Sequence, residues 1–203
     1  MFSGIVAGCG EINLITKENS FLTYIVKFPL CLLKNLKIGA SVANNGCCLT
    51  VTAINDKYVS FDIIKETLIH TNLKYLNIGD VINLERSLML GDEIGGHLVS
   101  GHINGLSEIV DIIRTKKNVE VWINNTNENF KKYIFRKGFI CIDGVSLTVG
   151  NISNDCFSIN LIPETISRTI FKNMSINKIV NIEIDCITKT IVDTVERIKY
   201  CKK

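Results

Sequence analysis

The chain has 203 residues, of which 46% are hydrophobic and 21% are charged, with a formal net charge of +3. This composition is typical of a folded globular protein that can bury one core or two small ones. The small, evenly spread charge argues against a nucleic-acid-binding protein, and no apolar stretch approaches the roughly 20 residues of a membrane helix. The opening residues lack a secretory signal, and the eight cysteines lack paired spacing. We therefore expect a cytoplasmic protein with reduced thiols.

Short segments rich in β-branched and aromatic residues recur along the chain and predict β-strands. Residues 23–28, 58–63 and 156–161 are clear examples. Turn dipeptides such as Asn45-Gly46 separate such segments about every ten residues, a rhythm typical of a small antiparallel barrel or sandwich. The sequence therefore predicts an all-β protein.

Two stretches interrupt the strands in a corresponding way. Residues 65–76 and 163–174 are each predicted to contain a helical turn. Beyond residue 185 an amphipathic helix is predicted over 188–203, and its apolar face consists of Ile191, Val192, Val195 and Ile198. This face could pack against its own subunit or gather identical subunits through facing apolar rows. The sequence leaves both interpretations open.

The chain contains an internal repeat. Asn-Gly-Cys-Cys-Leu-Thr-Val at residues 45–51 returns at residues 143–149 as Asp-Gly-Val-Ser-Leu-Thr-Val. The glycines of residues 91–96 permit a joint between the two copies. We therefore expect three units. They are an N-terminal barrel over 1–97, a C-terminal barrel over 98–187 and a terminal helix over 188–203.

Each repeat presents small polar residues at the same place. Strand alternation puts Cys48 and Thr50 on one face, and Ser146 and Thr148 on the equivalent face. Such positions suit a pocket that hydrogen-bonds a heterocycle and a polyol, although turn and edge residues facing water would look the same. The repeats differ at matched positions, which suggests that two similar ligands play different chemical parts. These pairs are Cys48 and Ser146, Ser41 and Phe139, Gly39 and Lys137, Ile5 and His102, and Ser87 and Asp185.

His102 is a candidate acid or base because imidazole exchanges protons near neutral pH, although many histidines in β-domains are structural. Cys48 is a candidate nucleophile or a small buried hydrophobe, with Cys47 pointing away from it. The chain has no Cys-x-x-Cys or His-Glu-x-x-His motif and no glycine-rich nucleotide fingerprint. The sequence therefore gives no sign of a metal ion or a nucleotide cofactor.

Long motifs across the whole chain resemble the alpha-chain type of the riboflavin synthase family. They lie at residues 1–6, 39–51, 92–102, 138–149, 161–165 and 192–197. The resemblance implies two six-stranded antiparallel Greek-key barrels, a C-terminal helix that helps to form a homotrimer, and a reaction without cofactor or metal. Two molecules of 6,7-dimethyl-8-ribityllumazine would dismutate by transfer of a four-carbon unit, giving riboflavin and 5-amino-6-ribitylaminouracil. In the family, the site lies between the N-terminal barrel of one subunit and the C-terminal barrel of its neighbour.

The resemblance also implies which residues bind substrate. In the first barrel these are Gly4, Ile5, Val6, Cys48, Leu49, Thr50, Asp62, Ile63, Ile64, Lys65, Glu66 and Thr67. In the second barrel they are Gly101, His102, Ile103, Lys137, Ser146, Leu147, Thr148, Ile162, Pro163, Glu164, Thr165, Ile166 and Ser167.

The resemblance further implies a set of residues important for activity. They are Phe2, Ser41, Cys48, His102, Ser146, Thr148 and Asp185. In the expected mechanism, His102 or a water that it orients removes a proton from the C7 methyl group of one lumazine. Water, Ser41 or Cys48 adds to the other ring. Ser146 and Thr148 hydrogen-bond a ring, and Asp185 orients a partner or moves a proton.

Two other functions would fit a small β-barrel. A lumazine- or flavin-binding carrier would keep one pocket and lose the polar residues of the other, whereas both sets are present here. A flavin-reductase-like protein would need a nicotinamide-binding domain, for which the sequence shows no pattern. The enzymatic interpretation therefore accounts for more of the sequence.

Overall fold

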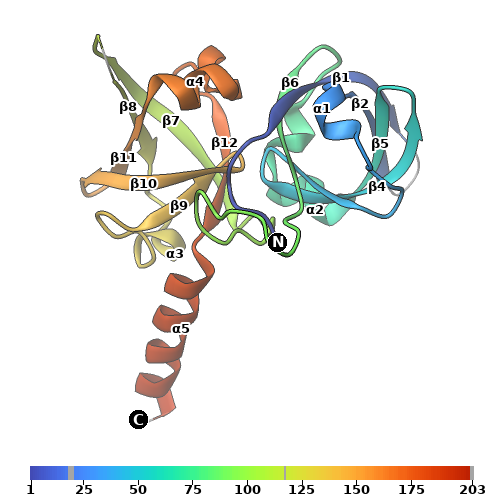
Figure 1. Cartoon of the computed structure of the whole chain (residues 1–203). Helices are drawn as coiled ribbons and strands as arrows, with labels where there is room; N and C mark the ends of the chain where they lie inside the picture. Colours follow the sequence, from blue (N-terminus) through green and yellow to red (C-terminus); the bar gives the residue numbers. More distant parts are fainter. Residues whose placement is uncertain (18–20, 117, 202–203) are drawn as a thin grey trace.

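The chain folds into two closed six-stranded antiparallel barrels followed by a long helix (Figure 1). The computed structural model describes residues 1–17, 21–116 and 118–201. The first barrel consists of β1 (Gly8–Lys17), β2 (Phe21–Lys27), β3 (Ser41–Asn44), β4 (Cys47–Asn55), β5 (Tyr58–Ile64) and β6 (Val81–Arg86). The second consists of β7 (Gly105–Arg114), β8 (Val119–Asn124), β9 (Phe139–Ile142), β10 (Val145–Ile152), β11 (Cys156–Leu161) and β12 (Ile179–Ile184).

Both barrels have the same strand order. The first runs β1-β2-β5-β4-β3-β6, and the second repeats this order from β7 to β12. The prediction of two Greek-key barrels is therefore confirmed. The helices are α1 (Leu30–Leu33), α2 (Lys65–His70), η1 (Asn72–Tyr75), α3 (Glu128–Lys131), α4 (Pro163–Arg168), η2 (Ile170–Asn173) and α5 (Cys186–Cys201). The predicted helical turns are therefore present, as α2 and η1 in the first barrel and α4 and η2 in the second.

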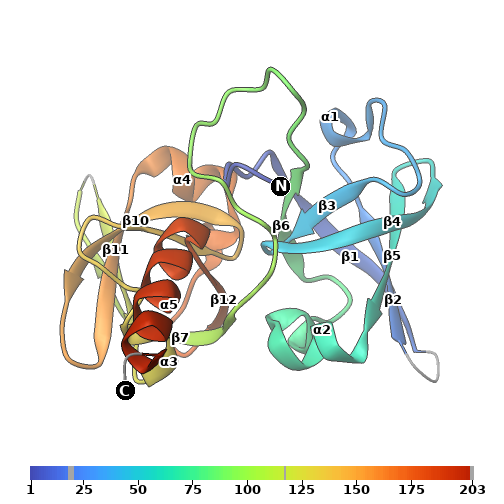
Figure 2. The ribbon, with the colours of Figure 1, turned by 90° about the horizontal axis from the view of Figure 1, so that it is seen from below.

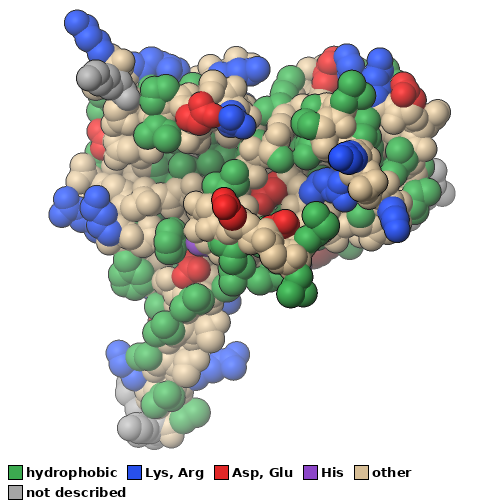
Figure 3. Space-filling view, viewed as in Figure 1, with side chains coloured by type: hydrophobic (Ala, Val, Ile, Leu, Met, Phe, Trp, Pro, Cys, Tyr) green, Lys and Arg blue, Asp and Glu red, His purple; other side chains and the backbone are tan. Residues whose placement is uncertain are grey.

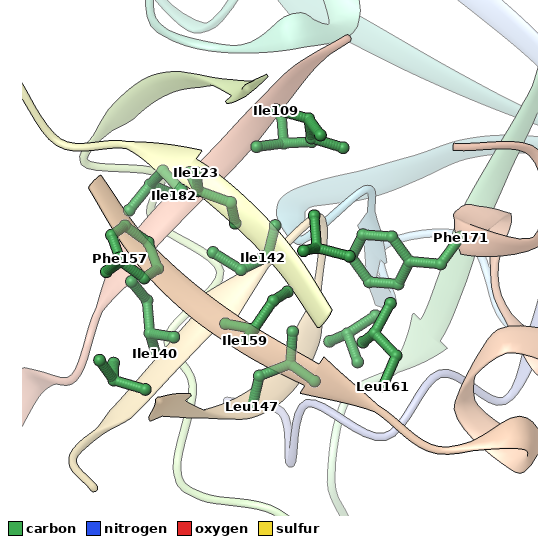
Figure 4. Packing of buried hydrophobic residues seen from close by; sticks show 14 of the residues in the cluster. Ile109, Ile123, Ile140, Ile142, Leu147, Phe157, Ile159, Leu161, Phe171 and Ile182 are labelled. Atoms are coloured by element: carbon green, nitrogen blue, oxygen red, sulfur yellow. The ribbon is translucent and has the colours of Figure 1, made fainter. Parts of the chain in front are cut away.

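Alternation along the strands fills each barrel with apolar side chains. In β5, Val59, Phe61 and Ile63 are completely buried, while Asp62 and Ile64 between and beyond them are exposed. Figure 4 shows the same arrangement in the second barrel, where side chains from β9, β10, β11 and β12 converge on one core. The barrels are therefore packed, and any ligand must bind on their outer faces or rims.

The two barrels meet at a pair of equivalent hairpin turns. Asn45 and Gly46 have φ values of 46° and 82°, and Asp143 and Gly144 have 47° and 81°. Positive φ at both central residues is the signature of a type I′ turn, for which Asn-Gly and Asp-Gly are preferred. A Cβ atom on Gly46 would lie 2.6 Å from the backbone nitrogen of Gly144. The turns therefore pack so closely that neither glycine can carry a side chain.

Buried amide side chains cross between the barrels at these turns. Asn83 Nδ2 donates to the Asp143 carbonyl and Asn181 Nδ2 donates to the Asn45 carbonyl, both at 2.8 Å. Asn72 Nδ2 adds a 2.8 Å hydrogen bond to Asp143 Oδ1. Because all five residues are buried, each of these bonds replaces water that is no longer available. The network fixes the orientation of one barrel against the other.

Helix α5 extends away from the barrels (Figure 1), and Figure 2 shows it below the second barrel, which it contacts through polar groups. Lys132 Nζ lies 2.5 Å from Glu196 Oε2, and the Tyr133 hydroxyl donates to Asp193. Most of the apolar face remains uncovered, as Figure 3 shows, since Ile187, Ile191, Val195 and Ile198 are between 47% and 62% exposed and only Val192 is half-buried. The interpretation that this face packs against its own subunit is therefore wrong.

Within the described residues, no helix has the length and apolar character needed to cross a membrane.

Asp143 should make folding stability depend on pH. Burial raises the pKa of this carboxyl from 3.8 to about 7, and its Oδ2 has no hydrogen-bond partner among the described residues. Because the folded-state pKa lies above the unfolded value, the protein loses stability as pH rises from about 3.8 to about 7, at up to about 1.4 kcal/mol per unit. We expect Asp143→Asn to abolish this part of the pH dependence, since Asn45 already occupies the equivalent position.

Urea unfolding at several pH values between roughly 4 and 8 would measure the effect. Asp56→Asn is a matched control, because it removes a carboxylate from an exposed turn with a similar positive φ of 53°. It should leave the pH dependence of unfolding unchanged. The prediction would be contradicted if the free energy of unfolding changed with pH in the same way in the wild type and in Asp143→Asn.

Candidate active site

The N-terminal segment and the linker between the barrels lie side by side and have equivalent structures. Phe2 N donates to the Val99 carbonyl at 2.7 Å, and Val99 N donates to the Phe2 carbonyl at 3.0 Å. We call residues 1–6 the first leader and residues 98–103 the second leader. Each carries a Ser-Gly pair just before the barrel that follows it in the chain.

A buried glutamate holds each leader. Ser3 donates its backbone N–H and its hydroxyl to Glu85 Oε1, both at 2.7 Å. Ser100 makes the same two 2.7 Å bonds to Glu183 Oε1. Burial raises the pKa of both glutamates, and the bonds from the leaders partly offset this. We did not predict these glutamates as site residues, although their place in the repeat, after Asn83 and Asn181, was visible in the sequence.

Each leader then crosses to the other barrel. The Gly4 carbonyl accepts a 2.7 Å hydrogen bond from Ser146 N, whereas the Gly101 carbonyl accepts a 2.8 Å bond from Cys48 N. The apolar residues that follow make the same exchange. Val6 packs in the core of the second barrel, and Ile103 packs against the core of the first.

This crossing corrects the sequence-based grouping of the pocket segments. Gly4, Ile5 and Val6 were assigned to the first barrel but lie against the second. Gly101, His102 and Ile103 were assigned to the second barrel but lie against the first. The repeat aligned the segments correctly, but it could not reveal that each leader leaves its own barrel.

The outer face of the second barrel has a hollow of about 360 Å³. Thr148 is exposed there and Ser146 is half-buried, while their neighbours Leu147 and Val149 point into the core. The strand alternation predicted for these residues is therefore present. We call this the second half-site. It is lined by Ile5, Gly95, Gly96, Lys137, Phe139, Ser146, Leu147, Thr148, Val149, Gly150, Asn160, Ile162 and Thr165.

The corresponding face of the first barrel carries different reactive groups, and we call it the first half-site. Cys48 is half-buried and Thr50 is exposed on β4, and Ser41 pairs with Thr50 across the sheet. His102 follows Gly101 and is exposed beside this face. Cys47 points inward as expected, and burial raises the pKa of its thiol to about 12. The first half-site therefore combines a thiol, two hydroxyl groups and an imidazole.

The remaining candidates of the pocket segments fall into two groups. Leu49 and Ile63 are core residues, so their side chains do not face a ligand. The others lie at or near the outer surface on β5, α2 and α4. They are Asp62, Ile64, Lys65, Glu66, Thr67, Pro163, Glu164, Ile166 and Ser167.

Several of these surface residues already have partners. Asp62 Oδ1 accepts a 2.7 Å bond from the Thr23 hydroxyl. Glu66 lies 3.0 Å from the His70 ring, and Glu164 pairs with an arginine one turn later. A ligand that binds these carboxylates must therefore share or displace an existing contact.

Phe2 and Asp185 both make contacts that stabilise the fold. Phe2 is completely buried and packs with Ala43, Val99 and Cys141, with Cys48 against this cluster. Its ring therefore supports the leader crossing from behind the first half-site. Asp185 is buried, and its Oδ2 accepts a 2.8 Å bond from Thr188 N in the first turn of α5. A carboxylate at this position stabilises the start of a helix.

In the described parts of the chain, no group of three or more His, Cys, Asp or Glu side chains could hold a metal ion. The eight cysteines, all of which are described, are free thiols. Cys48 is therefore present as a thiol in the first half-site.

Comparison with known proteins identifies the family. Residues 3–87 and 100–185 each match the family model described as "Lumazine binding domain". The chain is 52% identical to a riboflavin synthase of Buchnera aphidicola subsp. Schizaphis graminum over 98% of its length and 95% of the relative. The chain belongs to the riboflavin synthase family. A riboflavin synthase of Escherichia coli K12 is 48% identical over 98% of this chain and 93% of the relative.

Solved structures agree with this assignment. A structure of LumP in complex with 6,7-dimethyl-8-(1'-D-ribityl) lumazine matches with a TM-score of 0.83 and 29% identity, covering 91% of this chain and 99% of that one. LumP in complex with riboflavin matches with a TM-score of 0.84 and 30% identity. The family's fold and its association with lumazine-like ligands therefore extend to structures that are less similar in sequence.

The crossing of the second leader can be tested at Gly101. Its φ is 84°, and an added Cβ would lie 2.5 Å from Cys48 Cβ. Gly101→Ala should break the hydrogen bond from Cys48 N, so exchange of the Cys48 amide proton should become at least about tenfold faster. Gly79→Ala is the matched control, because its φ is 93° and no atom lies within 4 Å of an added Cβ.

Backbone strain should lower the free energy of unfolding of both variants by about 1–2 kcal/mol. Hydrogen exchange at the Cys48 amide, followed by NMR, separates the two effects because the control keeps the leader in place. Equal exchange rates in the two variants would refute the proposed contact.

Proposed function

We propose that this protein is a riboflavin synthase. It converts two molecules of 6,7-dimethyl-8-ribityllumazine into riboflavin and 5-amino-6-ribitylaminouracil by transferring a four-carbon unit. The observation that carries this proposal is the pair of half-sites, which share one backbone frame but differ in their reactive groups. Relatives named riboflavin synthase at 48% and 52% identity support it. A shared frame suits two identical substrates, and unlike groups suit their different chemical parts.

We further propose that each half-site binds one lumazine. In the first half-site, His102 or a water that it orients removes a proton from the C7 methyl group, whose carbanion is delocalised into the ring. Cys48, Ser41 or water adds to the partner ring and activates it. In the second half-site, Ser146 and Thr148 hydrogen-bond the ring system. No cofactor is required, because the four carbons pass from one substrate to the other.

The complete site is proposed to form between subunits, in a homotrimer. The exposed apolar face of α5 supports this arrangement, since such rows gather identical helices. The first half-site of one subunit would face the second half-site of its neighbour. This removes the orientational freedom of the two ring systems before they react. We also propose that the protein is cytoplasmic. Its three units are the barrels 1–97 and 98–187 and the helical unit 188–203, although α5 itself begins at Cys186.

The activity can be tested with the purified protein and the lumazine alone. We expect one riboflavin and one 5-amino-6-ribitylaminouracil for every two lumazines consumed, because the reaction is a dismutation. Chromatography of both products measures the ratio. Binding of the lumazine without turnover would instead support a lumazine-binding carrier, and absence of riboflavin would refute the enzymatic proposal.

Assembly can be tested on the exposed face of α5. Ile191→Asp combined with Ile198→Asp places charges in the apolar row and should convert trimers to monomers, with loss of most of the activity. The double change Thr190→Asp and Arg197→Asp is the matched control, because these residues are exposed, have the same spacing and lie beside the row. Sedimentation analysis and riboflavin formation measure the two effects. A fully assembled Ile191/Ile198 variant would refute the role of α5.

A further inference from the structure

His97 lies directly behind the second half-site. It is 7% exposed, its Nδ1 is 2.7 Å from Ser146 Oγ, and its ring stacks on Phe139 with centroids 4.9 Å apart and an interplanar angle of 14°. Ser146 and Phe139 both line the hollow, whereas His97 does not. His97 can therefore act on a ligand through its two neighbours.

The backbone around His97 is held as firmly as the ring. His97 N donates a 3.1 Å hydrogen bond to the Ser3 carbonyl. A Cβ atom on the preceding Gly96 would lie 2.2 Å from that same carbonyl and 2.8 Å from Ser146 Oγ. Glycine at position 96 is thus what allows the chain to pass close enough for His97 to reach Ser146.

This arrangement belongs to the second half-site and is not repeated in the first. The counterpart of Phe139 is Ser41, which offers no ring for an imidazole to stack on. The counterpart of Ser146 is Cys48, whose contacts are apolar neighbours and the Gly101 carbonyl. His97 therefore contacts two residues, Ser146 and Phe139, at which the second repeat differs from the first.

We propose that His97 is the positioning residue of the second half-site. Its unprotonated Nδ1 accepts a hydrogen bond from the Ser146 hydroxyl, and this bond directs the lone pairs of the serine oxygen towards a hydrogen-bond donor on the bound lumazine. This inference rests on the proposed function. A neutral imidazole favours the tautomer that carries its proton on Nε2, which leaves Nδ1 free to accept. Ser146 then presents an acceptor in a fixed direction, and only one orientation of the ligand edge satisfies it.

The charge on His97 decides whether this arrangement persists. Burial lowers the pKa of His97 below its ordinary value of 6.5, and the Asp185 carboxylate partly opposes this. Lys137 lines the same hollow, and Glu85 holds Ser3 against the His97 backbone. Protonation places a hydrogen on Nδ1, so the Ser146 hydroxyl must rotate and becomes a donor to the ligand. Binding at the second half-site should therefore weaken as the pH falls through the pKa of His97.

Two variants of His97 separate the hydrogen bond from the ring stack. His97→Asn places an amide oxygen near the position of Nδ1 and keeps the acceptor while losing the stack. His97→Phe keeps an aromatic ring against Phe139 and loses the acceptor. We expect His97→Phe to bind lumazine about tenfold more weakly and His97→Asn to stay within about threefold of the wild type. The acid limb of the binding profile should disappear in His97→Phe.

A double-mutant cycle tests whether His97 acts through Ser146. In the Ser146→Ala background, His97→Phe should have no further effect on lumazine affinity, measured by fluorescence titration. The matched cycle uses Cys48→Ala, the counterpart in the first barrel, where the effects should simply multiply. Thermal unfolding of each variant identifies any that do not fold, and His97→Asn provides the folded comparison in that case.

The outcomes are distinct. Wild-type affinity in His97→Phe, or effects that multiply in the Ser146 cycle, would overturn the role of His97. So would a His97→Asn variant that binds as weakly as His97→Phe. A wild-type protein that binds lumazine but forms no riboflavin would refute the proposed function instead, and the affinity cycle would still decide the role of His97.

Discussion

The contact between two hairpin turns is the constraint on which the rest of the structure depends. Gly46 and Gly144 meet backbone to backbone, and buried amides of Asn83 and Asn181 cross from each barrel to the turn of the other. Because these groups are buried, a small displacement would leave several of them without partners. The junction therefore gives the two barrels one relative orientation. That orientation sets where the leaders can cross.

The crossing of the leaders connects the junction with the chemistry. Each leader is held by a glutamate of its own barrel, and its glycine carbonyl then accepts a backbone hydrogen bond from the reactive strand of the other barrel. Ile5 therefore comes to lie beside Ser146, and His102 beside Cys48. The same frame thus surrounds two unlike sets of side chains. A reaction between two identical molecules needs this difference, because one must become a nucleophile and the other an electrophile.

Much of the fold could be predicted because it depends on local patterns. Alternation placed Cys47 inward and Cys48 outward, and the Asn-Gly and Asp-Gly pairs marked the turns that the structure shows to be type I′ in both copies. The site was predicted less completely. The grouping of Gly4 and Gly101 was wrong, since their partners are far away in the chain and no local pattern encodes a hydrogen bond between barrels. His97 was missed as a site residue for the same reason.

The sequence by itself determined the repeat, the strands, the helical turns and the types of residue in each half-site. Periodicity and turn chemistry act over a few residues, and they can be read without knowing the rest of the molecule. The tertiary structure alone decided which leader serves which barrel, which imidazole contacts Ser146 and which face of α5 remains exposed. Each of these depends on where two distant segments meet, and that is set by burial and packing across the whole chain.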